Sequence, residues 1–504
     1  MTSILSFLSF NFERLWPIIF ISLVPFLYNL MQNKLPNFQA MKYGFIYGFT
    51  FYILGMSWIW KLYPLSNFGF NKIWSFFILL GCWIFVGTFE GILISFVSFF
   101  INILNVGNLL KCLSISSIWI LLEWVQSLGP LGFSWFRLAI PLTNFPFLLQ
   151  ITSVFGSLIA SFIIVLINCF LTLIIINKNN NYYLKSMYKS LAFLLTFFLL
   201  SNYICSLLGN NCTGSINFSI IQGNISSYNK IGERFVKDNL DTYINLTEKS
   251  MKELHSIDLV LWPETAVPIY LNRNKEVYNL YKNIAIENKT NFIVGAFTLA
   301  DNKKYNALFC FNPDGNLSSA YRKGQLVPLG EFIPFSELIF KAFPYLKDFE
   351  AFSDNLKRDM STPTLNASFG DLGAYICFEA AFPDIPRSEI SKGAKIFCQA
   401  TNDSWFKDSK QLDQHLHHSV LRAIELNRYI LISANTGISA AINNRGKILK
   451  IVPKESMGYI TGEAKLFDYI TPYSYWGDIP IIGLSIILIG ISLIKTISFK
   501  NKEH

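Results

Sequence analysis

The sequence predicts a helical membrane domain joined to an α/β domain, and two observations carry that prediction. The 504-residue chain is 52% hydrophobic and only 15% charged, against about 25% charged in a typical soluble domain. The apolar excess is also uneven, because it is concentrated before residue 209 and after residue 478, while the block between them alternates strand-like and helix-like segments. A chain of this length has room for two sizeable units.

Seven apolar runs with few charges are candidate membrane spans, since roughly 20 such residues cross a bilayer. They are 15–32, 40–61, 73–104, 112–128, 147–176, 190–208 and 479–496. Residues 1–12 are apolar but short, and no basic residue precedes Arg14, so they predict a partial first helix and not a secretory signal. We therefore expect seven or eight helices, and domains at 1–208, 209–478 and 479–504.

Lysine residues predict how these spans are oriented, because positive charge stays on the cytoplasmic side. They gather in the loop 177–189 and at the C-terminus, at Lys178, Lys185, Lys189, Lys500 and Lys502. Both regions are expected inside, which leaves the block 209–478 outside. The net charge of +9 fits this topology and attraction to anionic lipid. The block lacks the basic stripe with interleaved aromatics that would indicate a nucleic-acid partner.

Within that block, short apolar runs alternate with helical patterns, which favours an α/β layered domain. Strands are expected at 215–222, 257–262, 291–298, 372–378, 395–400 and 429–434, and helices at about 230–253, 274–288 and 411–427. Two more strand patterns, 305–311 and 316–322, are joined by Asn312-Pro313-Asp314-Gly315, a strong turn signal. That hairpin would deliver Lys323 at the end of a rigid element.

Three residues of the block could together carry nucleophilic chemistry. Cys377 ends the strand GAYIC, Glu264 follows a strand in WPETAVP, and Lys323 follows the hairpin in YRKGQLVPLGEFIP. The thiolate is the nucleophile, so Cys377 needs a base or a cation nearby. Glu264 suits the base, and Lys323 would stabilise the oxyanion of a tetrahedral intermediate together with a backbone N–H. Each residue alone has a structural explanation, but the combination indicates acyl transfer through a thioester.

These motifs resemble the three signatures of the nitrilase (carbon–nitrogen hydrolase) superfamily, with Glu264, Lys323 and Cys377 at its catalytic positions. The segments NDSWF, ANTGISA and GFSW, with the flanking membrane helices, are similar to its bacterial apolipoprotein N-acyltransferase branch. The resemblance implies an α-β-β-α sandwich. It also implies transfer of an acyl chain from a phospholipid, through Cys377, to the N-terminal diacylglyceryl-cysteine of an apolipoprotein. It implies no metal or other cofactor, and a place in the bacterial inner membrane with the catalytic domain on the periplasmic side.

Other positions extend the resemblance or depart from it. Glu331 and Glu379 match further glutamates of the family and are expected to support the three catalytic residues. Phe378 stands where the family often has Tyr, and Ile231, nine residues after Gln222, stands where it often has Trp. These departures affect the expected contacts with the donor head group and leave the reaction type unchanged.

The apolar stretch 334–352 has two interpretations. It is either an amphipathic helix packed on the domain or an arm that dips into the bilayer and guides acyl chains. Phe340 and Phe343 within it, together with Phe378 and Trp405, are the expected substrate contacts.

Several other polar residues invite an assignment that the sequence does not support. His415, His417 and His418 have no third carboxylate or cysteine ligand at a convincing spacing, so no metal site is predicted. Glu90 and Glu123 lie inside membrane runs, where ionisable residues tend to be functional. We expect them either to pair between helices or to line an acyl-chain cavity.

The eight cysteines follow no framework spacing. Four are expected to pack within membrane segments: Cys82, Cys112, Cys169 and Cys205. In an oxidising compartment Cys212, Cys310 and Cys398 could pair, and the sequence does not say which.

Two alternative functions remain open at this point. The first is a membrane-tethered amidase of the nitrilase type that passes its acyl group to water. The second is a transporter or lipid-binding protein with an inactive outer domain, against which the intact Glu–Lys–Cys set argues.

Overall fold

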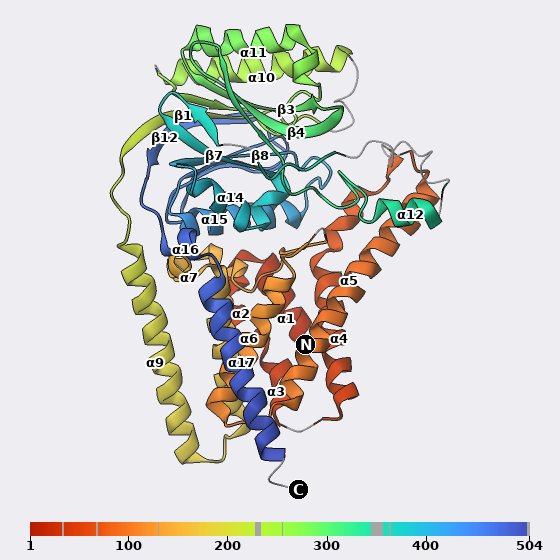
Figure 1. The fold of residues 1–504 in the computed structure, drawn as a ribbon, viewed down its shortest axis with the longest axis vertical. Helices are drawn as coiled ribbons and strands as arrows, with labels where there is room; N and C mark the ends of the chain where they lie inside the picture. Colours follow the sequence, from red (N-terminus) through yellow and green to blue (C-terminus); the bar gives the residue numbers. More distant parts are fainter. Residues whose placement is uncertain are drawn as a thin grey trace. The chain divides into compact units, whose positions relative to one another are not determined.

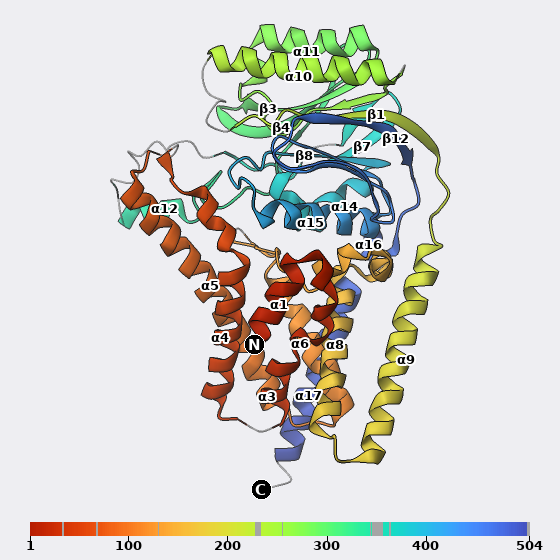
Figure 2. The ribbon, with the colours of Figure 1, turned by 180° about the vertical axis from the view of Figure 1, so that it is seen from behind.

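The computed structural model describes residues 1–32, 35–66, 69–129, 131–226, 233–254, 256–342, 344, 356–361 and 364–500. Their contacts divide the chain into two compact units (Figures 1 and 2). The helical unit holds Met1–Trp60, Phe76–Leu208 and Trp476–His504, and the α/β unit holds Lys61–Ser75 and Gly209–Tyr475. The division gives Lys61–Ser75 to the α/β unit, although the expected boundaries put it in the N-terminal domain.

The helical unit is built from apolar helices joined by short loops and 3-10 turns. The helices are α1 (Thr2–Asn11), α2 (Ile19–Ser22), α3 (Val24–Gln32), α4 (Asn37–Gly55), α5 (Lys72–Ile103), α6 (Asn108–Val125), α7 (Thr152–Phe155), α8 (Ser157–Ile176), α9 (Asn181–Ser206) and α17 (Ile479–Lys500). The expected run 147–176 is interrupted at Gly156, whose φ of 73° ends α7 and precedes α8. Residues 1–12 form α1, which at ten residues is too short to span.

Six helical segments of the described residues are long and apolar enough to cross a membrane. They are Glu13–Gln32, Lys72–Ile103, Asn108–Val125, Ser157–Ile176, Asn181–Ser206 and Ile479–Phe499. Helix α4 has 19 residues but carries Asn37, Gln39 and Lys42 near its start, and it is not among the six. The polytopic helical domain is therefore confirmed, while the total of seven or eight spans stays a prediction.

Close packing between α4 and α5 depends on glycine. A Cβ at Gly48 would lie 3.0 Å from the Cα of Gly91, and one at Gly44 would lie 2.5 Å from the carbonyl oxygen of Ile94. Small residues let membrane helices approach at such distances. Within the same unit, Glu90 of α5 accepts a hydrogen bond from the side chain of Gln126 at 2.5 Å. This is the pairing between helical segments that was one of two expectations for Glu90.

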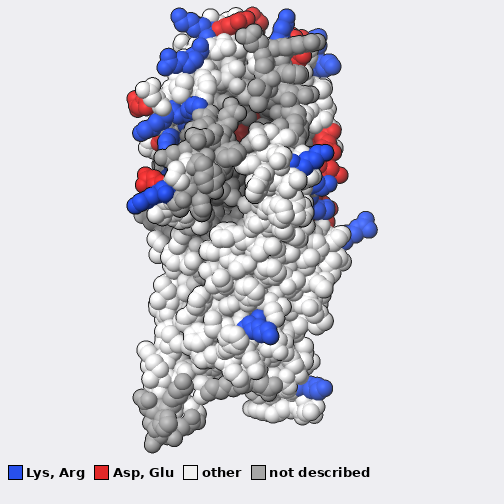
Figure 3. Space-filling model, turned by 90° about the vertical axis from the view of Figure 1, so that its right-hand side faces the viewer, with Lys and Arg blue, Asp and Glu red and all other residues white. Residues whose placement is uncertain are grey.

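Charged side chains are unequally shared between the two units. Figure 3 shows one face, on which Lys, Arg, Asp and Glu gather on the α/β unit while the surface of the helical unit is nearly uncharged. Large apolar side chains are exposed along the long helices, among them Trp74, Phe85, Phe193 and Ile487. An uncharged, apolar exterior of this kind suits a lipid environment.

The α/β unit contains two six-stranded sheets. The first has the order β12-β1-β2-β3-β4-β5, from Gly458–Leu466, Gly214–Gln222, Leu259–Leu261, Asn291–Ala300, Lys303–Phe311 and Leu317–Arg322. The second has the order β11-β10-β9-β8-β7-β6, from Ile448–Val452, Ser439–Ile442, Ile430–Ala434, Ile396–Thr401, Gly370–Ile376 and Leu365–Ala367. The central strands β1–β3 and β7–β9 are parallel, and the remaining pairs are antiparallel.

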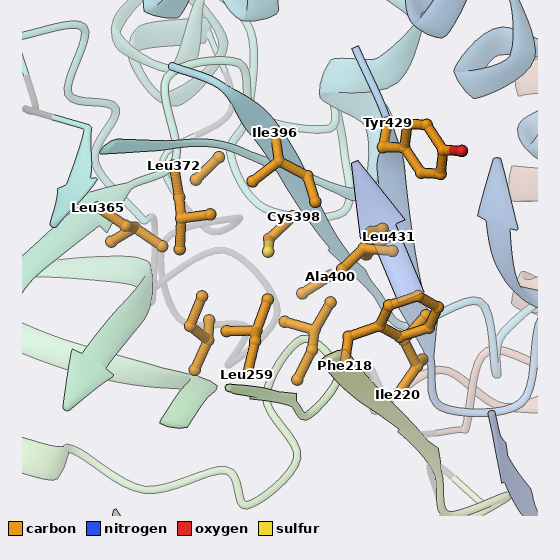
Figure 4. Packing of buried hydrophobic residues seen from close by; sticks show 14 of the residues in the cluster. Phe218, Ile220, Leu259, Leu365, Leu372, Ile396, Cys398, Ala400, Tyr429 and Leu431 are labelled. Carbon is orange, nitrogen blue, oxygen red and sulfur yellow. The ribbon is translucent and has the colours of Figure 1, made fainter. Parts of the chain in front are cut away.

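Apolar side chains from both sheets meet in one core. Phe218, Ile220 and Leu259 of the first sheet pack with Leu372 and Ile396 of the second (Figure 4). The outer face of the first sheet packs in a second cluster with α10 (Glu233–Glu253) and α11 (Lys275–Asn288). Helices α14 (Asp384–Ile390) and α15 (Lys410–Leu426) cover the second sheet (Figures 1 and 2). The expected α-β-β-α sandwich is thereby confirmed.

Each expected strand and helix of this unit is present, with ends that differ by a few residues. The hairpin is also confirmed: Gly315 has a φ of 80° and donates its N–H to the carbonyl of Asn312 at 2.7 Å, and Lys323 follows β5. Four strands were not expected, namely β6, β10, β11 and β12. Cys212, Cys310 and Cys398 all lie in the described part of the chain, and no two of them form a disulfide there.

Candidate active site

Lys323 lies at the centre of a buried ionic cluster. Its side chain is 1% exposed, and its Nζ lies 3.2 Å from Oε1 of Glu264 and 2.9 Å from Oε1 of Glu331. Burial alone would lower the pKa of Lys323, but the two carboxylates raise it well above its usual range. The lysine therefore stays a cation, and its contacts with the two carboxylates fix the position of its ammonium group.

Asn306, in β4, contacts both of these carboxylates. Its Nδ2 donates to Oε1 of Glu264 at 2.7 Å and to Oε1 of Glu331 at 3.2 Å, while its carbonyl accepts the N–H of Lys323 at 2.9 Å. Glu331 is fixed further by the N–H of Val327 at 2.8 Å. The hairpin strands β4 and β5 thus position both the cation and one of its partners.

The turn after β2 holds Glu264 in the cluster. The second oxygen of Glu264 accepts the backbone N–H of Asn402 at 2.8 Å, and Thr265 has a left-handed φ of 43°. Gly295 of β3 leaves room for this turn, since a Cβ there would lie 2.5 Å from the carbonyl oxygen of Pro263. Such close backbone approach is a reason to require glycine.

Cys377 directly follows β7 and begins a short 3-10 helix, Cys377–Ala381. Its φ of 54° is in the left-handed region, which is strained for any residue with a side chain. Nucleophiles are often placed on such sharp turns between a strand and a helix because the turn projects the side chain into the site. The strained φ therefore belongs to Cys377, the residue that the sequence analysis proposes as the nucleophile.

Electrostatic interactions link the thiol to the ionic cluster. Burial raises the pKa of Cys377 well above its usual value, and the charge of Glu264 raises it further, while Lys323 and a hydrogen bond with Thr401 lower it. At neutral pH the group is therefore a thiol, and a base must remove its proton before it can react. Glu264 is the carboxylate whose charge acts most strongly on the thiol.

Glu379 connects the cysteine segment to the lysine segment. Its carboxylate accepts the N–H groups of Gly324 at 2.6 Å, Gln325 at 2.9 Å and Ile376 at 2.6 Å, and the hydroxyl of Tyr321 at 2.9 Å. Burial raises the pKa of Glu379 to about 7, although these donors act to lower it. Glu379 therefore positions the segment after Lys323 and the segment before Cys377 through their backbone N–H groups.

A second buried polar cluster also includes Cys377. The Sγ of Cys377, a carboxylate oxygen of Asp403 and a ring nitrogen of His415 all lie within 4.8 Å of one another. His415 Nδ1 is 3.0 Å from Oδ1 of Asp403, and Nε2 is 2.9 Å from the carbonyl oxygen of Cys377. Both ring nitrogens are thus engaged by protein acceptors.

The four residues expected to contact substrate differ in how far they are buried. Phe378 is buried and packs against Phe382 with ring centroids 5.0 Å apart, Trp405 is partly exposed, and Phe340 lies in α12 (Ser336–Ala342) and is partly buried. Phe343 lies outside the described residues. Most of the stretch 334–352 beyond α12 also lies outside them, so the choice between packed helix and bilayer arm stays open.

Sequence reasoning missed several residues that the structure brings into the site. Asn306 is a polar residue in the middle of an otherwise apolar strand, which is a usable signal for a buried partner. Asp403 lies within the motif NDSWF but was given no role, and the one chemical role weighed for His415 was that of a metal ligand. The contact between His415 and the carbonyl oxygen of Cys377 has no sequence signature, because it depends on how α15 packs on the turn after β7.

Two family models match this chain, and together they cover most of it. The carbon–nitrogen hydrolase model matches residues 219–471, which is half of the chain, and the model of the apolipoprotein N-acyltransferase N-terminal domain matches residues 2–170.

Curated relatives match over nearly the full length. The chain is 26% identical over 509 residues to a protein of Wigglesworthia glossinidia brevipalpis, covering 99% of this chain and 97% of that one. It is 26% identical over 485 residues to a protein of Geobacter metallireducens, covering 95% and 91%. Both relatives are named apolipoprotein N-acyltransferase.

Solved structures are similar to about half of the chain. Saccharomyces cerevisiae Nit3, described as a member of branch 10 of the nitrilase superfamily, aligns with 53% of this chain and 96% of its own, at 20% identity and a TM-score of 0.40. The sequence matches are the stronger finding, since they extend across both units. The chain therefore belongs to the carbon–nitrogen hydrolase family, in the branch that carries an apolipoprotein N-acyltransferase N-terminal domain.

Proposed function

We propose that this chain is an acyltransferase that moves an acyl chain from a membrane phospholipid to the N-terminal amine of the diacylglyceryl-cysteine of an apolipoprotein. The observation that carries the proposal is the buried cluster of Glu264, Lys323 and Cys377 in a chain that also has the membrane helices of the acyltransferase branch. Full-length relatives with that name support the same reaction.

In the first half-reaction Cys377 attacks the carbonyl carbon of the donor ester. Glu264 takes the thiol proton as the S–C bond forms, which the raised pKa of the thiol requires. Lys323 stabilises the negative oxygen of the tetrahedral intermediate. The ester C–O bond then breaks, and Glu264 returns the proton to the departing oxygen of the lysophospholipid, leaving an acyl thioester on Cys377.

In the second half-reaction the amine of the apolipoprotein attacks the thioester. Glu264 accepts a proton from the attacking nitrogen, Lys323 again stabilises the oxyanion, and the C–S bond breaks. The sulfur takes a proton, the new amide bond remains on the lipoprotein, and the enzyme is restored. Both half-reactions use the same three residues, and neither needs an oxidant, a reductant or an added cofactor.

Membrane anchoring fits substrates that are themselves lipid-anchored. The six helical segments of the described residues that are able to cross a bilayer, together with the bacterial relatives, indicate a multi-pass bacterial membrane protein. Holding both lipids at one surface replaces a search through solution by a local encounter. We further propose that the protein lies in the inner membrane with the α/β unit on the periplasmic side, because lysines near the start of α9 favour the cytoplasm.

The amidase alternative is not favoured, since the relatives that extend across both units are named acyltransferases. Intact-protein mass spectrometry can separate the two. After incubation with phospholipid alone, wild-type protein is expected to gain the mass of one acyl chain, and Cys377→Ala is not. A diacylated lipopeptide should then remove the adduct much faster than water does. Equal loss with and without the lipopeptide would instead identify a hydrolase.

A further inference from the structure

His415 bridges a carboxylate and the backbone of the cysteine turn. It comes from α15, and its Nδ1 lies 3.0 Å from Oδ1 of Asp403 while its Nε2 lies 2.9 Å from the carbonyl oxygen of Cys377. The side chains of His415 and Asp403 are each 3% exposed, so water does not compete for these contacts. Neither residue has a role in the acyl-transfer steps described above.

Hydrogen-bond chemistry determines the charge of this imidazole. A carboxylate oxygen and a carbonyl oxygen can only accept, so each contact requires an N–H on the ring. A neutral imidazole has one N–H, and it would leave a lone pair facing one of the two oxygens. Both contacts are satisfied together only by the imidazolium.

The amide nitrogen of Gln399, a donor as placed, is the other neighbour of His415 Nε2, at 3.3 Å, and the Oε1 of Gln399 accepts the hydroxyl of Ser419. This contact is longer than the one with Cys377. Exchange of the oxygen and nitrogen of the carboxamide would place an acceptor next to Nε2 and a donor next to the hydroxyl. Gln399 is therefore compatible with an N–H at Nε2.

The environment of Asp403 is built to hold it in place. Its second oxygen accepts the hydroxyl of Thr401 at 3.2 Å. Gly437 leaves space beside it, since a Cβ there would lie 2.5 Å from Oδ2. Asp403 thus presents one oxygen to His415 while the other is occupied, which fixes the direction of the pair.

The strained backbone of Cys377 is held from both sides by buried ionisable groups. The N–H of the preceding residue, Ile376, donates to the carboxylate of Glu379 at 2.6 Å, and the carbonyl of Cys377 accepts from His415. A left-handed conformation is unfavourable for a non-glycine residue and persists only where its surroundings enforce it. The two contacts supply that enforcement at the nucleophile.

We propose that His415 and Asp403 form a charged positioning pair, in which the imidazolium holds the peptide after Cys377 in the left-handed conformation that aims the thiol. The expected effect on the acylation rate rests on the proposed acyl transfer, whereas the contacts of His415 do not depend on it. His415 gives up no proton during the reaction, and it acts on the thiol through the backbone of Cys377.

The charge on His415 depends on pH, and the sign follows from its neighbours. Burial would lower its pKa, but Asp403, the carbonyl of Cys377 and Glu264 raise it above the usual value. The carboxylate of Glu379 is turned away toward Gly324. Below the raised pKa both N–H groups are present. As pH rises through it, one contact is lost, so the rate of acylation falls.

The test compares three variants of the full-length protein in lipid nanodiscs: His415→Gln, Asp403→Asn and the matched control His417→Gln on the same helix. Acyl-adduct formation and alkylation of Cys377 by iodoacetamide are followed by mass spectrometry across pH, with thermal unfolding as a check on folding. His415→Gln is expected to slow acylation by about 10- to 100-fold. Asp403→Asn should shift the high-pH decline to lower pH, because the carboxylate charge that maintains the imidazolium is gone. The control should match wild type.

A merely structural role would lower rates without moving the high-pH decline, and that result in a folded Asp403→Asn protein would overturn the proposal. Wild-type behaviour of His415→Gln would overturn it as well. The alkylation profile keeps the two proposals separate. A His415-dependent profile in a protein that forms no acyl adduct would reject the acyl transfer and retain the positioning pair.

Discussion

The carboxylate of Glu379 accepts the backbone N–H of Gly324 at 2.6 Å, so the segment that carries Cys377 is tied directly to the residue that follows Lys323. The nucleophile and the cation come from different sheets, β7 and the β4–β5 hairpin. One buried carboxylate therefore sets the spacing between them. Its charge state is the first property to test.

Ionisation of Glu379 should produce a rise in acylation rate with pH. Its pKa is raised to about 7, mainly by burial, and all four contacts require it to accept. Below pH 7 the protonated acid gives up one acceptor site, and the spacing between Cys377 and Lys323 loosens. We expect Tyr321→Phe to move this rise to higher pH, because it removes a donor that lowers the pKa of Glu379.

Adduct formation measured between pH 5 and 9 checks this assignment. Tyr278→Phe, which alters a tyrosine in α11, is the control and should leave the profile unchanged. A rise that stays in place in Tyr321→Phe would assign it to another group.

Folding stability should respond to Glu379 in the opposite direction. A carboxyl group whose pKa is higher in the folded state than in the unfolded state binds its proton more tightly when folded. The stability that this contributes is fully present below the unfolded value and is lost as pH rises through about 7. Thermal unfolding of wild type should therefore lose more stability between pH 5 and 7 than that of Glu379→Gln. Identical losses in the two proteins would exclude this contribution.

Removal of the Lys323 charge should abolish activity and destabilise the fold. Lys323→Met leaves Glu264 and Glu331 buried and unpaired, and breaking such a cluster costs about 3–5 kcal/mol. The double change Lys323→Met with Glu331→Gln removes one of the stranded charges. It should recover part of the stability in thermal unfolding but none of the acylation.

Partial recovery of acylation in that double variant would show that the lysine acts through the fold alone. The comparison is useful because it separates the charge balance of the cluster from the stabilisation of the oxyanion.

Gly295→Ala should impair catalysis through the position of Glu264. The added methyl group would lie 2.7 Å from the Cα of Glu264 and 2.5 Å from the carbonyl of Pro263, so the turn must shift. A displacement of about 1 Å at a catalytic group can cost about 100-fold in rate. The matched control is Gly214→Ala in β1, where the nearest atom would be 3.8 Å away, and it should retain the wild-type rate. A wild-type rate for Gly295→Ala would mean that Glu264 needs no fixed position.

Exposed apolar residues of α12 should contribute to lipid capture. Leu338 is 68% exposed there, and Phe340 shares the helix. Leu338→Ser and Phe340→Ser are expected to raise the apparent KM for phospholipid while the maximal rate changes little, because acyl-chain contacts strengthen binding before the reaction. Ile286→Ser, at an exposed apolar position of α11, is the control. Unchanged kinetics with normal folding would support a helix that simply packs on the domain.

The sequence predicted the parts of the site that are carried by local patterns. Glu264, Lys323 and Cys377 each follow a strand or hairpin, and alternation and turn residues mark those elements well. Strand β11 is short and mostly exposed, so its apolar pattern is weak, and β12 pairs with β1 from the opposite end of the domain. No local pattern encodes such a partner.

The partners of the catalytic groups were harder to predict for the same reason. Asn306, Asp403 and His415 act through contacts between segments that are distant in the sequence. The chemical role considered for His415 was that of a metal ligand, because spacing along a helix can suggest a metal site but cannot reveal a contact with a carbonyl oxygen on another element. Buried polar residues without an obvious role are the remaining signal.

The pairing of β1 with β12 has a consequence for synthesis on the ribosome. Strand β1 is the first of the α/β unit to be made, yet one of its two neighbours, from Gly214 opposite Leu466 to Gln222 opposite Gly458, is the last. Until that partner emerges, one side of β1 has open N–H and C=O groups that could pair with another nascent chain. The domain therefore closes only when translation has nearly reached the final membrane helix.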